Sequence, residues 1–118
     1  LKAVHEIARN NERLFEMVRN DVRDILNSPY IKPEEVTRVS QSFERIIENS
    51  IADLDFVQQI LSSDYLKMTD AERATVLKER EDRSKEMVAE VERKTKRYSD
   101  IISFREMQDR INNRATDY

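Results

Sequence analysis

The absence of glycine constrains this chain more than any other feature. None occurs in 118 residues, and only two prolines are present. Turns with a positive φ angle normally use glycine, because it lacks the Cβ atom that clashes in that conformation. Such turns must therefore be few. Long helices joined by two or three connections meet this condition, so the sequence predicts an all-α protein.

The composition supports a folded helical domain. Charged and hydrophobic residues each make up 38% of the chain, and the net charge is only -3. The apolar residues recur periodically, as they do on amphipathic helices with one buried face. We predict an antiparallel three-helix bundle with long helices and a short C-terminal fourth segment. Residues 1–112 form this single domain, and residues 113–118 form a frayed tail.

The first helix is predicted over residues 1–26. Its apolar stripe has heptad spacing, with intervals that alternate between four and three. The members of the stripe are Val4, Ala8, Asn11, Phe15, Val18, Val22 and Ile25, and Ile7, Leu14 and Leu26 widen it. Asn11 is polar, and we expect its side chain to bond to water or to a partner group.

Two prolines mark the break between the first and second helices. Pro29 disfavours a helical conformation at the residue before it, and Pro33 suits the first position of a new helix. The second helix is predicted over residues 33–62. It is the most hydrophobic of the three, and Phe43, Ile47 and Leu54 are expected to be buried.

A capping box at Thr69 and Glu72 predicts the start of the third helix. Tyr65, Leu66 and Met68 precede it and are expected to fold back onto the core. Residues 78–86 are almost wholly charged, so this section is expected to be solvated or to overhang the bundle. Within it, ion pairs are expected between Lys78 and Asp82 and between Glu79 and Arg83.

The third helix is predicted to end near Tyr98, with a break at Ser99 and Asp100. A short final segment follows, because Ser103 and Glu106 have capping-box spacing. This final segment contains Phe104, Met107 and Ile111.

The residues that usually carry chemistry are missing or isolated. The chain has no cysteine and one histidine, His5, so neither a Cys/His metal site nor a carboxylate site with two Glu-x-x-His motifs is available. Without glycine it has no phosphate-binding Gly-rich loop. The carboxylate pairs Glu12/Glu16 and Glu44/Glu48 indicate surface charge. We therefore expect no enzyme activity, no cofactor, no metal and no small-molecule substrate.

One basic cluster could contact nucleic acid. It contains Arg93, Lys94, Lys96 and Arg97. Glu90 and Glu92 adjoin the cluster and can neutralise it by pairing on the helix surface. Nucleic-acid binding usually requires a basic stripe on the domain, which this chain lacks. The pattern thus disfavours nucleic acid as a partner.

Two stretches carry a resemblance to a known family. They are "SPYIKPEEVTRVSQSFERIIENSIADLDFV" and "MTDAERATVLKEREDRSKEMVAEVERKTKRYSDIIS". Their order of a polar turn, an acidic helix start, a capping segment and a long charged helix resembles the helical transfer proteins of Bacteroidetes conjugative transposons. Those proteins are similar in turn to the TrbJ-type components of type IV secretion systems. The resemblance spans roughly residues 1–112 and carries no functional residues over.

The resemblance implies a non-enzymatic component of a conjugative DNA-transfer apparatus. Its partners would be other transfer proteins or a second copy, and its location periplasmic or exported, with a signal presumed removed before Leu1. The alternative from another class is a cytoplasmic helical or coiled-coil adaptor that binds partner helices. No apolar run is long enough to span a membrane.

The end of the third helix is the predicted interaction surface. Its apolar residues form a narrow stripe that the first two helices are expected to leave partly exposed. The stripe consists of Met87, Val88, Val91, Tyr98, Ile102 and Met107. In the alternative interpretation, Phe104, Met107 and Ile111 fold back and cover this stripe within one chain.

Overall fold

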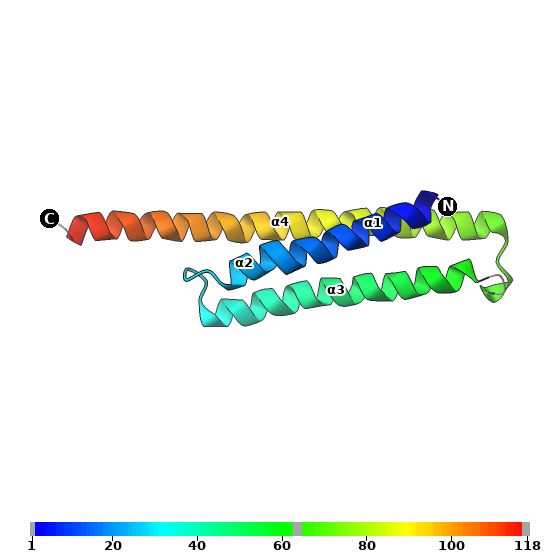
Figure 1. Ribbon diagram of the computed structural model, residues 1–118, viewed down its shortest axis with the longest axis horizontal. Coiled ribbons are helices and arrows are strands. Elements are labelled where there is room, and N and C mark those ends of the chain that lie inside the picture. The colour runs from blue at the N-terminus through cyan, green and yellow to red at the C-terminus, as the bar shows by residue number, and fades with distance from the viewer. Residues whose placement is uncertain (1, 63–64, 117–118) are drawn as a thin grey trace.

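The computed structural model describes residues 2–62 and 65–116, which form three long antiparallel helical rods (Figure 1). The first rod joins α1 (Lys2–Met17), a π-helical turn (η1, Val18–Val22) and α2 (Arg23–Leu26). The second rod is α3 (Pro33–Leu61) and the third is α4 (Asp70–Thr116). A 3₁₀ turn (η2, Tyr65–Lys67) lies between α3 and α4. The predictions of an all-α fold and of a three-helix arrangement are confirmed.

The bundle is long and thin because α4 is much longer than the other rods. The molecule measures 75 × 22 × 16 Å along its principal axes. The first rod contacts both α3 and α4. Figure 1 shows α4 continuing past the connection between α2 and α3 to the C-terminal end of the chain.

The predicted break near Ser99 and Asp100 is wrong, and no separate fourth segment forms. α4 is a single helix of 47 residues. No proline or glycine occurs after residue 33, so nothing in this stretch removes a backbone donor or favours a turn. Ser103 and Glu106 lie inside the helix. Of the predicted frayed tail, residues 113–116 are helical and residues 117–118 lie outside the described residues.

Both predicted helix starts are confirmed, and each is capped. Pro33 is the first residue of α3, and the Glu35 carboxylate accepts a hydrogen bond from the Lys32 backbone N–H at 2.9 Å. At the start of α4, the Thr69 hydroxyl accepts from the Glu72 N–H at 3.1 Å, and the Glu72 carboxylate accepts from the Thr69 N–H at 3.4 Å. This reciprocal pair satisfies two donors that the helix itself leaves unbonded.

The connection before α4 differs from its prediction. Tyr65 packs against the core and lies 6.3 Å from Phe56 between ring centroids, but Leu66 is 77% exposed. Leu66 and Lys67 adopt positive φ angles of 48° and 51°. Because the chain has no glycine, residues with a Cβ atom make this left-handed turn.

The core consists of two apolar clusters. The larger cluster lies toward the α2–α3 connection and contains Leu14, Val22, Ile25, Ile31, Val39, Phe43, Ile46, Val88 and Val91. The smaller cluster lies at the other end of the bundle and contains Ile7, Val57, Ile60 and Leu77. Of the three residues predicted to be buried, Phe43 is buried, whereas Ile47 and Leu54 are half-buried.

A layer of buried polar residues separates the two clusters. The charged section of α4 that was expected to be solvated or to overhang contributes to it. Glu81 and Ser84 are buried. The Asp53 carboxylate of α3 accepts from Arg80 at 2.8 Å and from Arg83 at 2.7 Å. The section therefore does not overhang the bundle, because Arg80 and Arg83 pair with Asp53 of α3. Most of its side chains are nevertheless exposed, as the solvated alternative predicted.

Pairing within this section follows the prediction only in part. Lys78 pairs with Asp82 at 3.2 Å as expected, but Arg83 pairs with Asp53 on α3. The Glu81 carboxylate forms an ion pair with Lys85 at 3.0 Å. This contact lowers the pKa of the Glu81 carboxyl below its ordinary value.

Asn11 belongs to the same polar layer. Its amide donates to the Ile7 carbonyl at 2.8 Å, and its side-chain oxygen accepts from the Ser50 hydroxyl. The Asn10 amide donates to Ser84 of α4 at 2.9 Å. The expectation of a partner-bonded side chain at Asn11 is confirmed.

The π turn sets which side of the first rod faces the core. Ile7, Asn11 and Leu14 are buried, whereas Ala8, a member of the predicted stripe, is exposed. A further heptad after Leu14 would bring Asp21 to the core. The wider π turn adds one residue, so Val22 takes this position instead. The stripe predicted for residues 1–26, with the residues that widen it, is thus confirmed except at Ala8.

Candidate interaction surfaces

The exposed end of α4 carries three large apolar side chains on one face. Phe104, Met107 and Ile111 are 55%, 51% and 56% exposed. Their spacing of three and four residues places them along one side of a helix. We call these three residues the α4 stripe.

The α2–α3 connection holds α4 in one rotation where it leaves the bundle. The Arg105 guanidinium donates to the Tyr30 carbonyl at 2.7 Å and to both Glu35 oxygens at 2.7 and 3.0 Å. The Tyr30 hydroxyl donates to Asp109 at 3.0 Å. Each residue turns a helix by about 100°, so the α4 stripe faces away from the side that carries Arg105.

These anchoring bonds also fix the charges at this end. The hydrogen bonds from Arg105 and then from the Lys32 backbone lower the pKa of Glu35 to about 2. The hydrogen bond to Asp109 raises the pKa of Tyr30. Glu35 is therefore ionised and Tyr30 neutral near pH 7, as the anchoring contacts require.

Five of the six residues of the predicted interaction surface are buried or half-buried. Val91 and Val88 are 0% and 8% exposed and belong to the larger cluster. Three further members are half-buried against this cluster: Met87, Tyr98 and Ile102. Met107 alone among the predicted residues is exposed. The surface prediction is thus wrong for Val88 and Val91.

The fold-back alternative is wrong as well. The first rod and α3 cover the stripe of residues 87–102, and α4 itself runs straight on. Phe104 and Ile111 are the surface residues that the prediction left out. The sequence feature that could have identified them is their spacing of three and four residues from Met107. This spacing places them on a different side of the helix from Tyr98 and Ile102.

A second candidate surface is an apolar groove between the first rod and α3. Its sides are formed by Val18, Val22 and Leu26 from the first rod and by Ser40, Phe43 and Ile47 from α3. Arg19 and Arg23 edge it on one side, and Glu44 and Glu48 edge it on the other. We call it the α2–α3 groove. The π turn forms part of one wall, and such turns frequently occur at functional sites.

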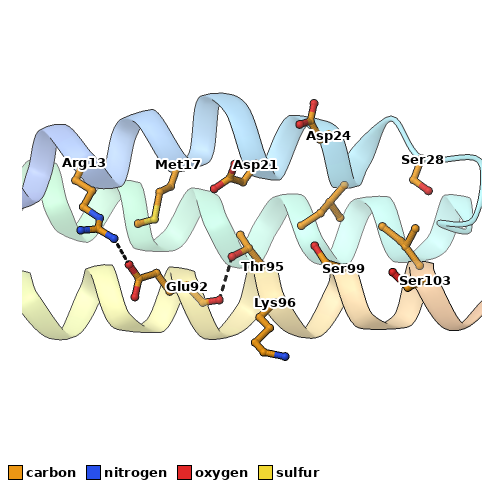
Figure 2. A pocket seen from close by; sticks show the side chains of 12 residues that line it. Arg13, Met17, Asp21, Asp24, Ser28, Glu92, Thr95, Lys96, Ser99 and Ser103 are labelled. Atoms are coloured by element: carbon orange, nitrogen blue, oxygen red, sulfur yellow. Dashed lines mark hydrogen bonds and ion pairs between the residues drawn. The ribbon is translucent and has the colours of Figure 1, made fainter.

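A third groove, between the first rod and α4, is lined mostly by polar and charged residues (Figure 2). Arg13 forms an ion pair across it with Glu92, and Thr95 donates to the Glu92 carbonyl at 3.0 Å. The hydroxyls of Ser99 and Ser103 continue along α4. No residue that lines this groove is a histidine, so no hydroxyl here has an imidazole base beside it.

The other residues singled out in the sequence are surface groups. His5 is exposed, as are the pairs Glu12/Glu16 and Glu44/Glu48. Within residues 2–62 and 65–116 no group of three His, Cys, Asp or Glu side chains could hold a metal ion. In the same ranges, no helix is both long and apolar enough to cross a membrane.

The basic cluster of α4 is largely paired. Arg93 binds Glu86 at 2.7 Å, Lys94 binds Glu90 at 3.2 Å and Lys96 binds Asp100 at 3.0 Å. Glu92, which was expected to neutralise the cluster, binds Arg13 instead.

Comparisons with protein-family models, with curated proteins and with solved structures find no match to this chain.

Proposed function

We propose that this protein is a non-enzymatic assembly module that binds a protein partner through the α4 stripe. The observation that carries the proposal is a helix end, bonded to the bundle at Arg105 and Asp109, that exposes Phe104, Met107 and Ile111 on one side. Grouped apolar side chains that stay in water are typical of contact sites, whereas single ones are common on any surface.

The stripe alone can give only a modest affinity. Fully burying a large apolar side chain contributes about 1.5–3 kcal/mol, and each of these three is already half covered. Together they would contribute about 2–4 kcal/mol before the entropic cost of association. A stable contact therefore needs further polar and apolar groups around the stripe.

The particular role we propose is in a conjugative DNA-transfer apparatus, outside the cytoplasm. It is supported by the resemblance of residues 28–57 and 68–103 to the transposon transfer proteins. A helix end projecting from a bundle suits a part that joins larger assemblies. The competing proposal is a cytoplasmic adaptor for partner helices, for which the open α2–α3 groove is the supporting observation.

Photo-cross-linking in the native host tests the contact surface. We expect a photoreactive amino acid at Met107 to give one discrete cross-linked product, because this side chain would be buried by the partner. The matched control is Ile51, an isolated apolar residue of α3 that is 48% exposed. Equal cross-linking at both positions, or none at Met107, would contradict the proposal.

The same experiment separates the two roles. Mass spectrometry of the product identifies the partner, and cell fractionation locates it. A transfer protein outside the cytoplasm supports the conjugative role, and a cytoplasmic helical protein supports the adaptor.

A further inference from the structure

We propose that the α2–α3 groove receives the α4 stripe of a second copy of this chain. This inference rests on the proposed function of the stripe as a contact surface and names its partner. Both surfaces are apolar and open, and they belong to the same molecule.

The two surfaces match in length. Residues 104–111 of α4 rise by about 10 Å along the helix axis, and the wall of the groove from Val18 to Leu26 rises by about 12 Å. A helix with its apolar side toward the groove would therefore lie along the whole length of the wall. Three apolar side chains would then cover the groove sides formed by Val18, Leu26 and Ile47.

The charges beside the two surfaces are complementary. Glu44 and Glu48 are four residues apart on the groove edge, and neither forms an ion pair within the described part of the chain. Arg110 and Arg114 are also four residues apart, on one side of the α4 stripe. Arg110 forms an exposed pair with Glu106 of its own helix at 3.1 Å.

At the other edge of the groove, formed by Arg19 and Arg23, no positive charge of the α4 stripe segment (residues 104–111) would face the two arginines. The residue of α4 on that side is Gln108, which is neutral and exposed. It would face Arg19 and Arg23. The charge pattern thus favours one orientation of the incoming helix, with its arginines toward α3.

The stripe cannot enter the groove of its own chain. Arg105 and Asp109 hold the opposite side of α4 against Tyr30 and Glu35, and α4 then runs straight away from the bundle. A stripe in a groove must therefore join two molecules. Because the two surfaces differ, the contact is heterologous, and each copy can give its stripe to one neighbour and accept a stripe from another.

Disulfide cross-linking tests this contact, and the absence of native cysteine makes it clean. One variant is Met107→Cys and the other is Ile47→Cys, in the groove. After mixing and oxidation we expect a heterodimer in at least fivefold greater yield than with Ile51→Cys, which lies one turn further along α3 and outside the groove. Glu48→Cys, on the exposed edge, is a second groove position in case Ile47→Cys disturbs the fold.

Three results would overturn the inference. They are equal yields with groove and control positions, a predominant Met107→Cys homodimer, which would mean that stripe packs on stripe, and no cross-linked product. Each leaves the proposed function to be judged separately by photo-cross-linking at Met107. A product there with a different protein would keep the assembly role and exclude the second copy.

Discussion

Replacing Val91 with aspartate is expected to unfold the chain. Val91 is completely buried in the larger cluster between all three rods. A carboxylate at this position would have no hydrogen-bond partner, and burying an unpaired charge costs several kcal/mol. Domains of this size are stable by only about 5–15 kcal/mol, so we expect a loss of at least about 4 kcal/mol in the free energy of unfolding, measured with urea.

The matched control for this variant is Met107→Asp, on the same helix but half exposed. We expect it to change the free energy of unfolding by about 0.5 kcal/mol or less. If Val91→Asp were as stable as Met107→Asp, the core face of α4 would be assigned wrongly. If both variants unfolded the chain, the α4 stripe would belong to the core.

Asp53→Ala is expected to give the second largest loss of stability. The carboxylate is buried and accepts from two arginines of α4, and Arg80 also lies 4.3 Å above the Phe56 ring. Removing it leaves two positive charges beside a low-dielectric interior. Breaking a buried pair costs about 3–5 kcal/mol. Because Arg83 is half exposed and can regain water, we expect about 2–3 kcal/mol in urea unfolding.

Asp55→Ala provides the comparison, since Asp55 lies on the same helix and is exposed. Its effect should stay within about 0.5 kcal/mol. A similar small effect for Asp53→Ala would show that the two arginine contacts add nothing to stability. In that case the polar layer would not hold α3 and α4 together.

The sequence was sufficient for the features that depend on local chemistry. Prolines, capping residues and apolar periodicity act within a few residues of their position, so the starts of α3 and α4 were predicted correctly. The bonded state of Asn11 was also predictable, because a polar residue in an apolar stripe needs a partner.

Features that depend on contacts between helices were not predictable. The sequence carries no local mark for the π turn at Val18–Val22, which places Val22 instead of Asp21 in the core. The charged residues of α4 were expected to be solvated or to overhang the bundle, although some of them pair with α3. Their pairing partner Asp53 is about thirty residues away, so a search for pairs along one helix could not find it.

The candidate site was misplaced for a similar reason. The predicted surface rested on an underestimate of how far the first rod and α3 cover α4. The fold-back alternative rested on a break at Ser99, whereas α4 is continuous there. The true exposed stripe begins only beyond Ile102. The spacing of the stripe is visible in the sequence. That Phe104 lies on a different side of the helix from Tyr98 and Ile102 can be concluded only once α4 is known to be continuous.

The assembly role of α4 depends on this helix projecting past the bundle, and small-angle X-ray scattering of dilute protein measures that directly. The structure has a radius of gyration of 19.9 Å over its Cα atoms and a longest dimension of 75 Å. A compact domain of this length would have a radius of gyration of about 13–14 Å. We expect values near 20 Å and 75 Å when scattering is extrapolated to zero concentration. A radius of gyration nearer to about 14 Å would contradict the projecting helix, because the C-terminal part would then fold back on the bundle.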